Sequence, residues 1–258
     1  MSWMSNRWGR EEMQRVSIDA AGIHYTDLNK EIKRAVAAGA GEITLTNVLG
    51  QRFIADGLRG DVSLIIRGVP GGDLGMFMSG PTCTVYGNSD HASGNTMDAG
   101  TIIIHGSSGD AVAHSMRGGS IYVRDNVGYR AGIHMKQYEE KCPVLVIGGS
   151  ARAFLGEYMA GGLIILLRRG EVGPFSERGI GSGIHGGEIV VRGEISPECL
   201  GVGAKVAPAS SEDIGRITPY LQRYRAVFGE DSALQPDAPY TRVTPSSSRP
   251  FANKYVWE

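Results

Sequence analysis

The sequence predicts an all-β solenoid, a single-stranded parallel β-helix of about eight coils, because apolar runs and glycines recur along it with one period. Eight short runs of aliphatic and β-branched residues begin 21, 19, 19, 19, 23, 20 and 25 positions apart. Strands of an ordinary sheet have no reason to recur at one spacing, whereas a period near twenty is typical of a solenoid. The runs span residues 43–45, 64–66, 83–85, 102–104, 121–123, 144–146, 164–166 and 189–191.

Glycines mark the turns between these runs. The chain has 38 glycines, about twice what an average usage of about 7% gives. They stand shortly before seven runs, which predicts one turn repeated in each coil, since glycine adopts positive φ without steric cost. These are Gly41, Gly60, Gly80, Gly100, Gly119, Gly162 and Gly187. A second apolar column, expected on the opposite side of each coil, lies three residues before five of them: Phe77, Met97, Met116, Met159 and Ile184.

The first 40 residues are predicted to form an N-terminal segment and a capping helix. Residues 1–24 show no pattern that predicts an element. Thr26 has the character of an N-cap, and Gly39 that of a helix stop. Between them Leu28, Ile32 and Val36 recur at helical spacing. A helix directly before the first coil is expected to plug the open end of the solenoid.

The coils are predicted to occupy residues 41–208. Strand alternation points the outer two residues of each run inward and the middle one outward. The predicted interior therefore contains Ile102, Ile104, Ile121, Val123, Val144 and Val146. The outward residues Ile103, Leu145 and Ile165 are apolar too, so we expect other loops of the chain or another subunit to cover that face.

A C-terminal helix over residues 209–230 and an extended tail over 231–258 are predicted to follow. Ile217, Leu221 and Tyr224 share one face of the helix, which Gly229 ends. Pro219 inside this pattern allows either one kinked helix or two short ones, the second capped by Thr218. The tail is rich in proline and serine and is expected to form no core, although its last aromatic residue, Trp257, suggests a docking strap.

Two long coils are predicted to carry the contacts with partner proteins. The extra residues lie between the fifth and sixth runs and between the seventh and eighth, where solenoids often collect insertions on a binding face. Both loops combine arginine with aromatic residues, a mixture enriched at protein interfaces. The predicted contact residues are Tyr129, Arg130, Tyr138, Arg169, Phe175 and Arg178, with Trp257 assisting.

Composition and motifs indicate a protein without an active site of its own. A formal net charge of −1 favours neither nucleic acid nor an anionic membrane as a partner. The N-terminus lacks the apolar stretch of a signal peptide, which predicts a cytoplasmic protein. No residues have the spacing of a metal site or a catalytic triad, and the chain itself is expected to hold no cofactor. The three cysteines are interpreted as small core residues, and the six histidines as surface or hydrogen-bonded groups.

Residues 181–186 read Gly-Ser-Gly-Ile-His-Gly and match the dinucleotide-binding pattern by letter. That pattern needs a helix after it to hold the phosphate. A strand run follows instead, so the loop is interpreted as structural. A solenoid enzyme of the pectate-lyase kind would need acidic and basic residues clustered on consecutive coils, and these are not evident.

Three stretches resemble the GXGXG domain, the C-terminal β-helix of the glutamate synthase large subunit, and its free-standing archaeal form. They are residues 46–58, the phrase Gly-Gly-x-Ile-x-Val-x-Gly at 186–193, and Gly-Ile-Gly-Ser-Gly at 179–183. The resemblance implies a right-handed β-helix, which agrees with the general handedness of parallel crossovers. It also implies a non-catalytic subunit that scaffolds a glutamine amidotransferase subunit and a flavin-dependent synthase subunit. FMN and iron–sulfur clusters are then expected in those partners.

The resemblance leaves the identity of the complex open. Related β-helices serve N-methylglutamate synthase and formylmethanofuran dehydrogenase. A homo-oligomeric scaffold with no enzyme partner is the other class that fits the sequence.

Overall fold

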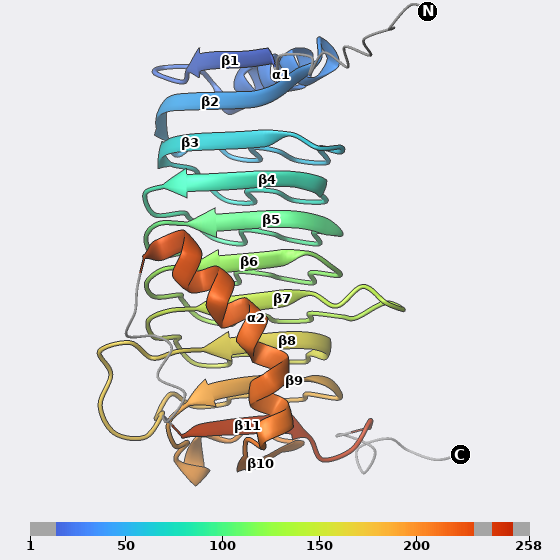
Figure 1. Ribbon diagram of the computed structural model, residues 1–258, viewed down its shortest axis with the longest axis vertical. Helices are drawn as coiled ribbons and strands as arrows, with labels where there is room; N and C mark the ends of the chain where they lie inside the picture. The colour runs from blue at the N-terminus through green and yellow to red at the C-terminus, as the bar shows by residue number, and fades with distance from the viewer. Residues whose placement is uncertain (1–13, 230–238, 250–258) are drawn as a thin grey trace, which may run out of the picture.

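One sheet of eleven strands organises the molecule, described here by a computed structural model that covers residues 14–229 and 239–249 (Figure 1). From β1 to β9 each strand pairs in parallel with the next one along the chain, which confirms the parallel β solenoid. The strands are β1 (Gln14–Asp19), β2 (Ala40–Leu49), β3 (Ser63–Val69), β4 (Ser79–Tyr86), β5 (Ala99–Ile104), β6 (Ser120–Val123), β7 (Val144–Ile147), β8 (Ala160–Leu166), β9 (Gly186–Arg192), β10 (Ala204–Pro208) and β11 (Tyr240–Pro245). Two α-helices, α1 (Tyr25–Ala37) and α2 (Ser211–Phe228), and a short 3-10 helix, η1 (Pro197–Cys199), complete the described elements.

The strand register stacks the apolar runs into one interior column. Its members are fully buried and align from coil to coil: Ile43, Leu64, Cys83, Ile102, Ile121, Leu145, Ile164 and Ile189. In β7 the prediction was wrong by one residue, because Leu145 and Ile147 face the interior whereas Val144 and Val146 face outward. Four apolar residues in succession carry no alternation, so only the pairing with β6 and β8 fixes the register.

The repeated turn contains three residues with positive φ, each separated by one residue. In the turn at residues 92–96, Ala92, Gly94 and Thr96 have φ values of 58°, 76° and 52°. Ala92 and Thr96 donate their amides to the next coil, at 2.8 Å from Asp110 O and 2.8 Å from His114 O, whereas Gly94 donates to Leu74 O of the previous coil at 2.7 Å. Gly179, Gly181 and Gly183 are the same three positions in the last turn of this kind, so the glycine-rich loop is structural, as interpreted from the sequence.

The second apolar column is confirmed with one correction. Met78 is buried in it, whereas Phe77 is half exposed. Phe77 is the third positive-φ residue of its turn and points outward. The prediction counted back from Gly80, but this glycine lies three residues before the interior strand residue Cys83. The other four glycines used for this column, Gly100, Gly119, Gly162 and Gly187, lie two residues before theirs. The described column also contains Leu58 and Met135, and its members are Leu58, Met78, Met97, Met116, Met135, Met159 and Ile184.

The N-terminal end contains a strand that the sequence did not reveal. β1 pairs with β2, although residues 1–24 had given no prediction. Helix α1 lies beside them at the N-terminal end of the stack, and its Leu28 and Ile32 pack into the main core (Figure 1). His24 rather than Thr26 is the N-cap, because its Nδ1 accepts a hydrogen bond from Thr26 N at 3.4 Å.

Helix α2 covers the outer face of the sheet from β5 to β9 (Figure 1). Outside the helix the outward column is polar at Ser17, Thr44 and Thr84, with Ile65 as a half-buried apolar exception. Where the helix lies it is apolar throughout, at Ile103, Tyr122, Val146, Ile165 and Val190. Ile217, Leu221 and Tyr224 of α2 are buried against these residues. The apolar outer face is therefore covered by the chain's own helix, and it gives no argument for a partner subunit there.

Helix α2 is continuous through Pro219. It begins with a capping box between Ser210 and Asp213 and ends at Gly229, whose φ is 71°. Thr218 is not a second N-cap, since its Oγ1 donates a hydrogen bond to Ile214 O at 2.7 Å. A single helix is therefore formed where the sequence allowed two.

Part of the tail enters the sheet. β11 lies between β9 and β10 and is antiparallel to both. Val243 is fully buried in the main core. The expectation that the tail forms no core is therefore wrong for residues 240–245.

Candidate functional site

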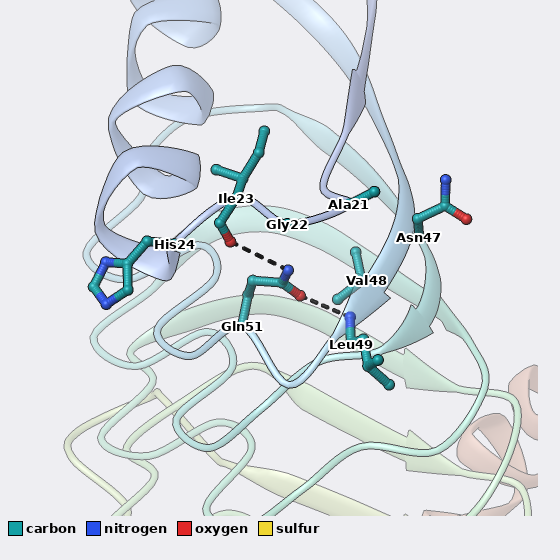
Figure 2. A pocket seen from close by; sticks show the side chains of 8 residues that line it. All are labelled: Ala21, Gly22, Ile23, His24, Asn47, Val48, Leu49 and Gln51. Atoms are coloured by element: carbon teal, nitrogen blue, oxygen red, sulfur yellow. Dashed lines mark hydrogen bonds between the residues drawn. The ribbon is translucent and has the colours of Figure 1, made fainter.

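A hollow of about 710 Å³ lies near the N-terminal end, between the β1–α1 connection and the end of β2 (Figure 2). Its central polar group is the Gln51 amide, whose Nε2 donates to Ala20 O at 2.9 Å and whose Oε1 accepts from Leu49 N at 2.7 Å. The His24 side chain points away from Gln51 (Figure 2). The Gln51 amide therefore connects the β1–α1 segment to the end of β2 by hydrogen bonds. The residues that line the hollow include no pair of groups suited to acid–base or nucleophilic chemistry.

Polar side chains between consecutive coils are bonded to the backbone of the next coil. The Asp110 amide donates to His91 Nδ1 at 2.9 Å, and the Asp110 carboxylate accepts from Tyr129 N at 2.8 Å. Asn126 Oδ1 accepts from Ser150 N at 2.8 Å. These groups satisfy backbone donors that would otherwise lack partners, so they hold the stack together.

The outward side chains of the repeated turns form the candidate site. We call the group Arg130, His134, Phe154, Glu157, Tyr158 and Arg178 the turn surface. Arg130 Nε donates to Glu157 Oε2 at 2.7 Å, and the Glu157 side chain is only 10% exposed. The guanidinium carbons of Arg130 and Arg178 lie 5.2 Å and 5.4 Å from the centre of the Phe154 ring. Two arginines are thus oriented by one aromatic ring, and one of them also by a buried carboxylate.

Two histidines lie close together in this region. The ring centres of His114 and His134 are 5.8 Å apart. The ring of His134 is also 5.6 Å from that of Tyr158. Positive φ at Ala113 and His134 breaks the alternation of an extended strand, so both rings share the outer side. Burial, and secondarily His134, lowers the pKa of His114, while Asp73 opposes this effect.

The predicted contact residues separate into exposed and buried groups. Tyr129, Arg130, Tyr138 and Arg178 are exposed, Tyr138 on the loop between Met135 and β7. Phe175 is buried in the main core, and Arg169 lies beneath α2, where its Nη2 donates to Arg124 O at 2.7 Å. Trp257 lies outside the described residues.

The coil inserts are shorter than the sequence indicated. The regular turns of the repeat include Tyr129, Arg130 and Arg178. The residues that are extra to the regular coils are therefore only about 137–142 and 168–174. Sequence reasoning missed Phe154, Glu157 and Tyr158. The repeat could have identified these three residues. They lie 24 residues after Arg130, Ile133 and His134 and occupy the same positions in the next coil.

The thiols behave as core groups at two of three positions. Cys83 and Cys199 are buried, and burial raises the pKa of Cys83 to about 12. Cys142 is exposed. Within residues 14–229 and 239–249, no three His, Cys, Asp or Glu side chains are grouped so as to hold a metal ion. In the same ranges, no helix has the length and apolar character needed to cross a membrane.

Comparison with known proteins identifies the family. The model of the GXGXG motif family matches residues 17–235. The chain belongs to the GXGXG family. Gly179, Gly181 and Gly183 themselves read Gly-x-Gly-x-Gly, and their alternating positive φ values explain this pattern of glycines.

Two other proteins are similar to this GXGXG chain. An uncharacterized protein of Methanocaldococcus jannaschii is 52% identical over 254 residues, which are 95% of this chain and 97% of the relative. A chain in the crystal structure of the formyltransferase/hydrolase complex from Methylorubrum extorquens, solved with methylofuran, has a TM-score of 0.59 at 18% identity. That match covers 87% of this chain and 88% of the other. At this identity the likeness shows a shared fold.

Proposed function

We propose that this GXGXG protein is a non-catalytic β-helix subunit of a multi-subunit enzyme of the glutamate synthase type. It scaffolds a glutamine amidotransferase subunit and a flavin-dependent, iron–sulfur synthase subunit. FMN and the iron–sulfur clusters belong to those partners, and this chain holds none. The complex as a whole is an oxidoreductase of glutamate biosynthesis in the cytoplasm.

The turn surface is the observation that carries the proposal. Arg130 and Arg178 are exposed yet oriented by Phe154, so little side-chain entropy remains to be lost when a partner binds. Arginine and aromatic residues are enriched among the residues that dominate binding energy. The coil-to-coil polar groups, by contrast, are already used by the backbone. This distribution supports binding rather than catalysis.

A second candidate complex follows from the structural comparison. The similar chain of Methylorubrum extorquens comes from a formyltransferase/hydrolase complex. That observation favours a subunit of a formylmethanofuran dehydrogenase-like complex as the alternative, with N-methylglutamate synthase as a further one.

Co-purification tests the proposal directly. The tagged chain, expressed at its natural level in its own cells, is expected to elute with a glutamine amidotransferase subunit and a yellow, iron-containing synthase subunit. Elution with formyl-transferring subunits would select the alternative complex. A homo-oligomer eluting alone would refute both and leave a scaffold without an enzyme partner.

Removing the exposed arginines and tyrosine should weaken assembly without unfolding the coils. The variant combines Arg130→Gln, Arg178→Gln and Tyr138→Ala. Glutamine at 130 retains a donor for the nearly buried Glu157, and the buried Phe175 is left intact. We expect at least about a tenfold loss of affinity for the partner subunits, since each central contact is worth about 1–2 kcal/mol or more.

The matched control carries Arg15→Gln and Lys30→Gln, two exposed cations at the N-terminal end. It should co-purify with partners as the natural chain does. Equal recovery of partners by the triple variant and the control would exclude the turn surface as the contact.

A further inference from the structure

A second hollow, of about 280 Å³, lies between the loop after β8 and the coil that begins near Ser150. Its charged and polar lining includes Arg152, Arg168, Glu171, Ser176 and Glu177. The volume is below the roughly 300–1,000 Å³ of sites for drug-sized ligands. It suits a small ion.

Arg168 is the unusual residue of this hollow. It is only 8% exposed, and its Nη1 donates to Gly173 O at 2.9 Å and to Arg192 O at 3.4 Å. Unlike the neighbouring Arg152, which pairs with Glu177 at 3.4 Å, Arg168 forms no ion pair with any described carboxylate. Buried charges are ordinarily paired, because removing an unpaired charge from water is costly.

Burial disfavours the charged form of this side chain. Burial lowers the pKa of Arg168, and Glu171 opposes the shift without forming an ion pair. The two carbonyl contacts occupy one terminal nitrogen, Nη1, which leaves Nε and Nη2 as donors for another group. A guanidinium presents such donors in a fork that matches two oxygens of a carboxylate or a phosphate.

We propose that this hollow is a binding site for a small oxyanion, a carboxylate or a phosphate, held by Arg168. Arg152 in the same lining is paired with Glu177, so Arg168 supplies the positive charge that an anion would meet, and the Ser176 hydroxyl is a further donor. The exposed Glu171 limits the affinity by repulsion. None of the turn surface residues lines the hollow, and the proposal is independent of the proposed function.

The test uses the full chain and inorganic phosphate, with acetate and citrate as carboxylate probes and chloride at equal ionic strength as the reference. A ligand that binds only the folded state raises the melting temperature in a saturable way. We expect a rise with phosphate, with the carboxylates, or with both, and calorimetry should give one site per chain. A rise with phosphate alone identifies a phosphate-bearing ligand, and a rise with carboxylates alone identifies a carboxylate.

Two substitutions make the test specific. Ser176→Glu supplies a carboxylate from the lining of the hollow, so it should raise the melting temperature without ligand and abolish the phosphate or carboxylate response. Glu171→Gln should leave the melting temperature unchanged and tighten binding several-fold. Arg117→Gln, a change of an exposed arginine outside the hollow, should alter neither.

Three results would overturn the proposal. These are no response beyond that of chloride, a response that persists in Ser176→Glu, and a lowered melting temperature in Glu171→Gln. The last would show that Glu171 already acts as the counter-ion. Arg168→Lys retains the charge but loses the fork, and it should weaken binding about tenfold or more.

Discussion

Gly94→Ala is expected to destabilise the protein by several kcal/mol, and Ile121→Val is expected to restore part of the loss. A Cβ at Gly94 would lie 2.2 Å from Ile121 Cδ1. Overpacking of this kind costs about 1–3 kcal/mol, and left-handed backbone for a non-glycine residue about 1–2 kcal/mol. Valine lacks Cδ1, and Ile→Val alone costs about 0.5–1.5 kcal/mol. The double variant should therefore lose less stability than the two single variants lose together.

Gly57→Ala is the matched control for the backbone. Its φ is 61°, and no atom lies within 4 Å of the added Cβ, so it should show the conformational cost alone. Thermal unfolding checks both, with about 2–4 °C expected per kcal/mol for a chain near this size. Equal losses in Gly57→Ala and Gly94→Ala, with no rescue by Ile121→Val, would contradict the steric explanation.

The same steric relation recurs along the interior. At four turns whose central residue is glycine, an isoleucine Cδ1 occupies the space that a Cβ would need, whereas a Cβ at Gly181 would have Ala204 Cβ and Val243 Cγ1 as its nearest atoms. This holds for Gly75 with Ile102, Gly94 with Ile121, Gly132 with Ile164, and Gly156 with Ile189. Where that residue is alanine, as at Ala55 and Ala113, the corresponding strand residues are Cys83 and Leu145. The glycine or alanine of one coil and the strand residue of a later coil therefore form a size-matched pair.

Tyr224→Ala should detach α2 from the sheet and cost about 3–5 kcal/mol, as truncation of a buried aromatic residue does. Tyr224 is fully buried, and its hydroxyl donates to Arg124 O at 2.8 Å. The variant should also bind more of a dye that reports exposed apolar surface, because the apolar face of β5–β9 becomes accessible. Melting temperature and dye fluorescence measure the two effects.

Tyr224→Phe separates packing from hydrogen bonding. Arg169 Nη2 also donates to Arg124 O, at 2.7 Å, so the carbonyl keeps a partner when the hydroxyl is lost. The expected cost is then only about 0.5–1.5 kcal/mol. Gln222→Ala, on the exposed side of the same helix, should change stability by less than about 0.5 kcal/mol. A loss in Tyr224→Phe as large as in Tyr224→Ala would show that packing is not the main contribution.

Periodicity was sufficient to predict the parallel strands, because each coil repeats the same chemistry at the same spacing. It failed where a local pattern has no alternation, as in β7, or where one coil differs in length, as at Gly80. The sequence also predicted the apolar face of α2 without revealing its target. The alternative of a second subunit could be dismissed only when the helix was seen on that face.

The candidate site was predicted in part. Arg130 and Arg178 stood out as charged residues beside aromatics, but their common neighbour Phe154 lies 24 residues from each. Contacts between coils join positions that are remote in sequence, so a residue-by-residue search does not find them. Phe175 was misplaced for a related reason. The extra length of its coil led us to place Phe175 in the inserted loop. The regular path of the coil resumes at Phe175, which pairs with Ile195 and has its side chain in the core.

Helix α2 packs only on strands β5–β9, and this limits where whole coils can be added to the solenoid or removed from it. Adding or deleting a whole coil among β2–β4 would leave every pairing partner of the helix in place, because coils contact mainly their neighbours. The same change among β5–β9 would shift half of the sheet by about 4.8 Å along the stack and misalign the helix that spans it. Gain or loss of repeats during evolution should therefore be confined to the N-terminal half, and homologues of different length should differ there.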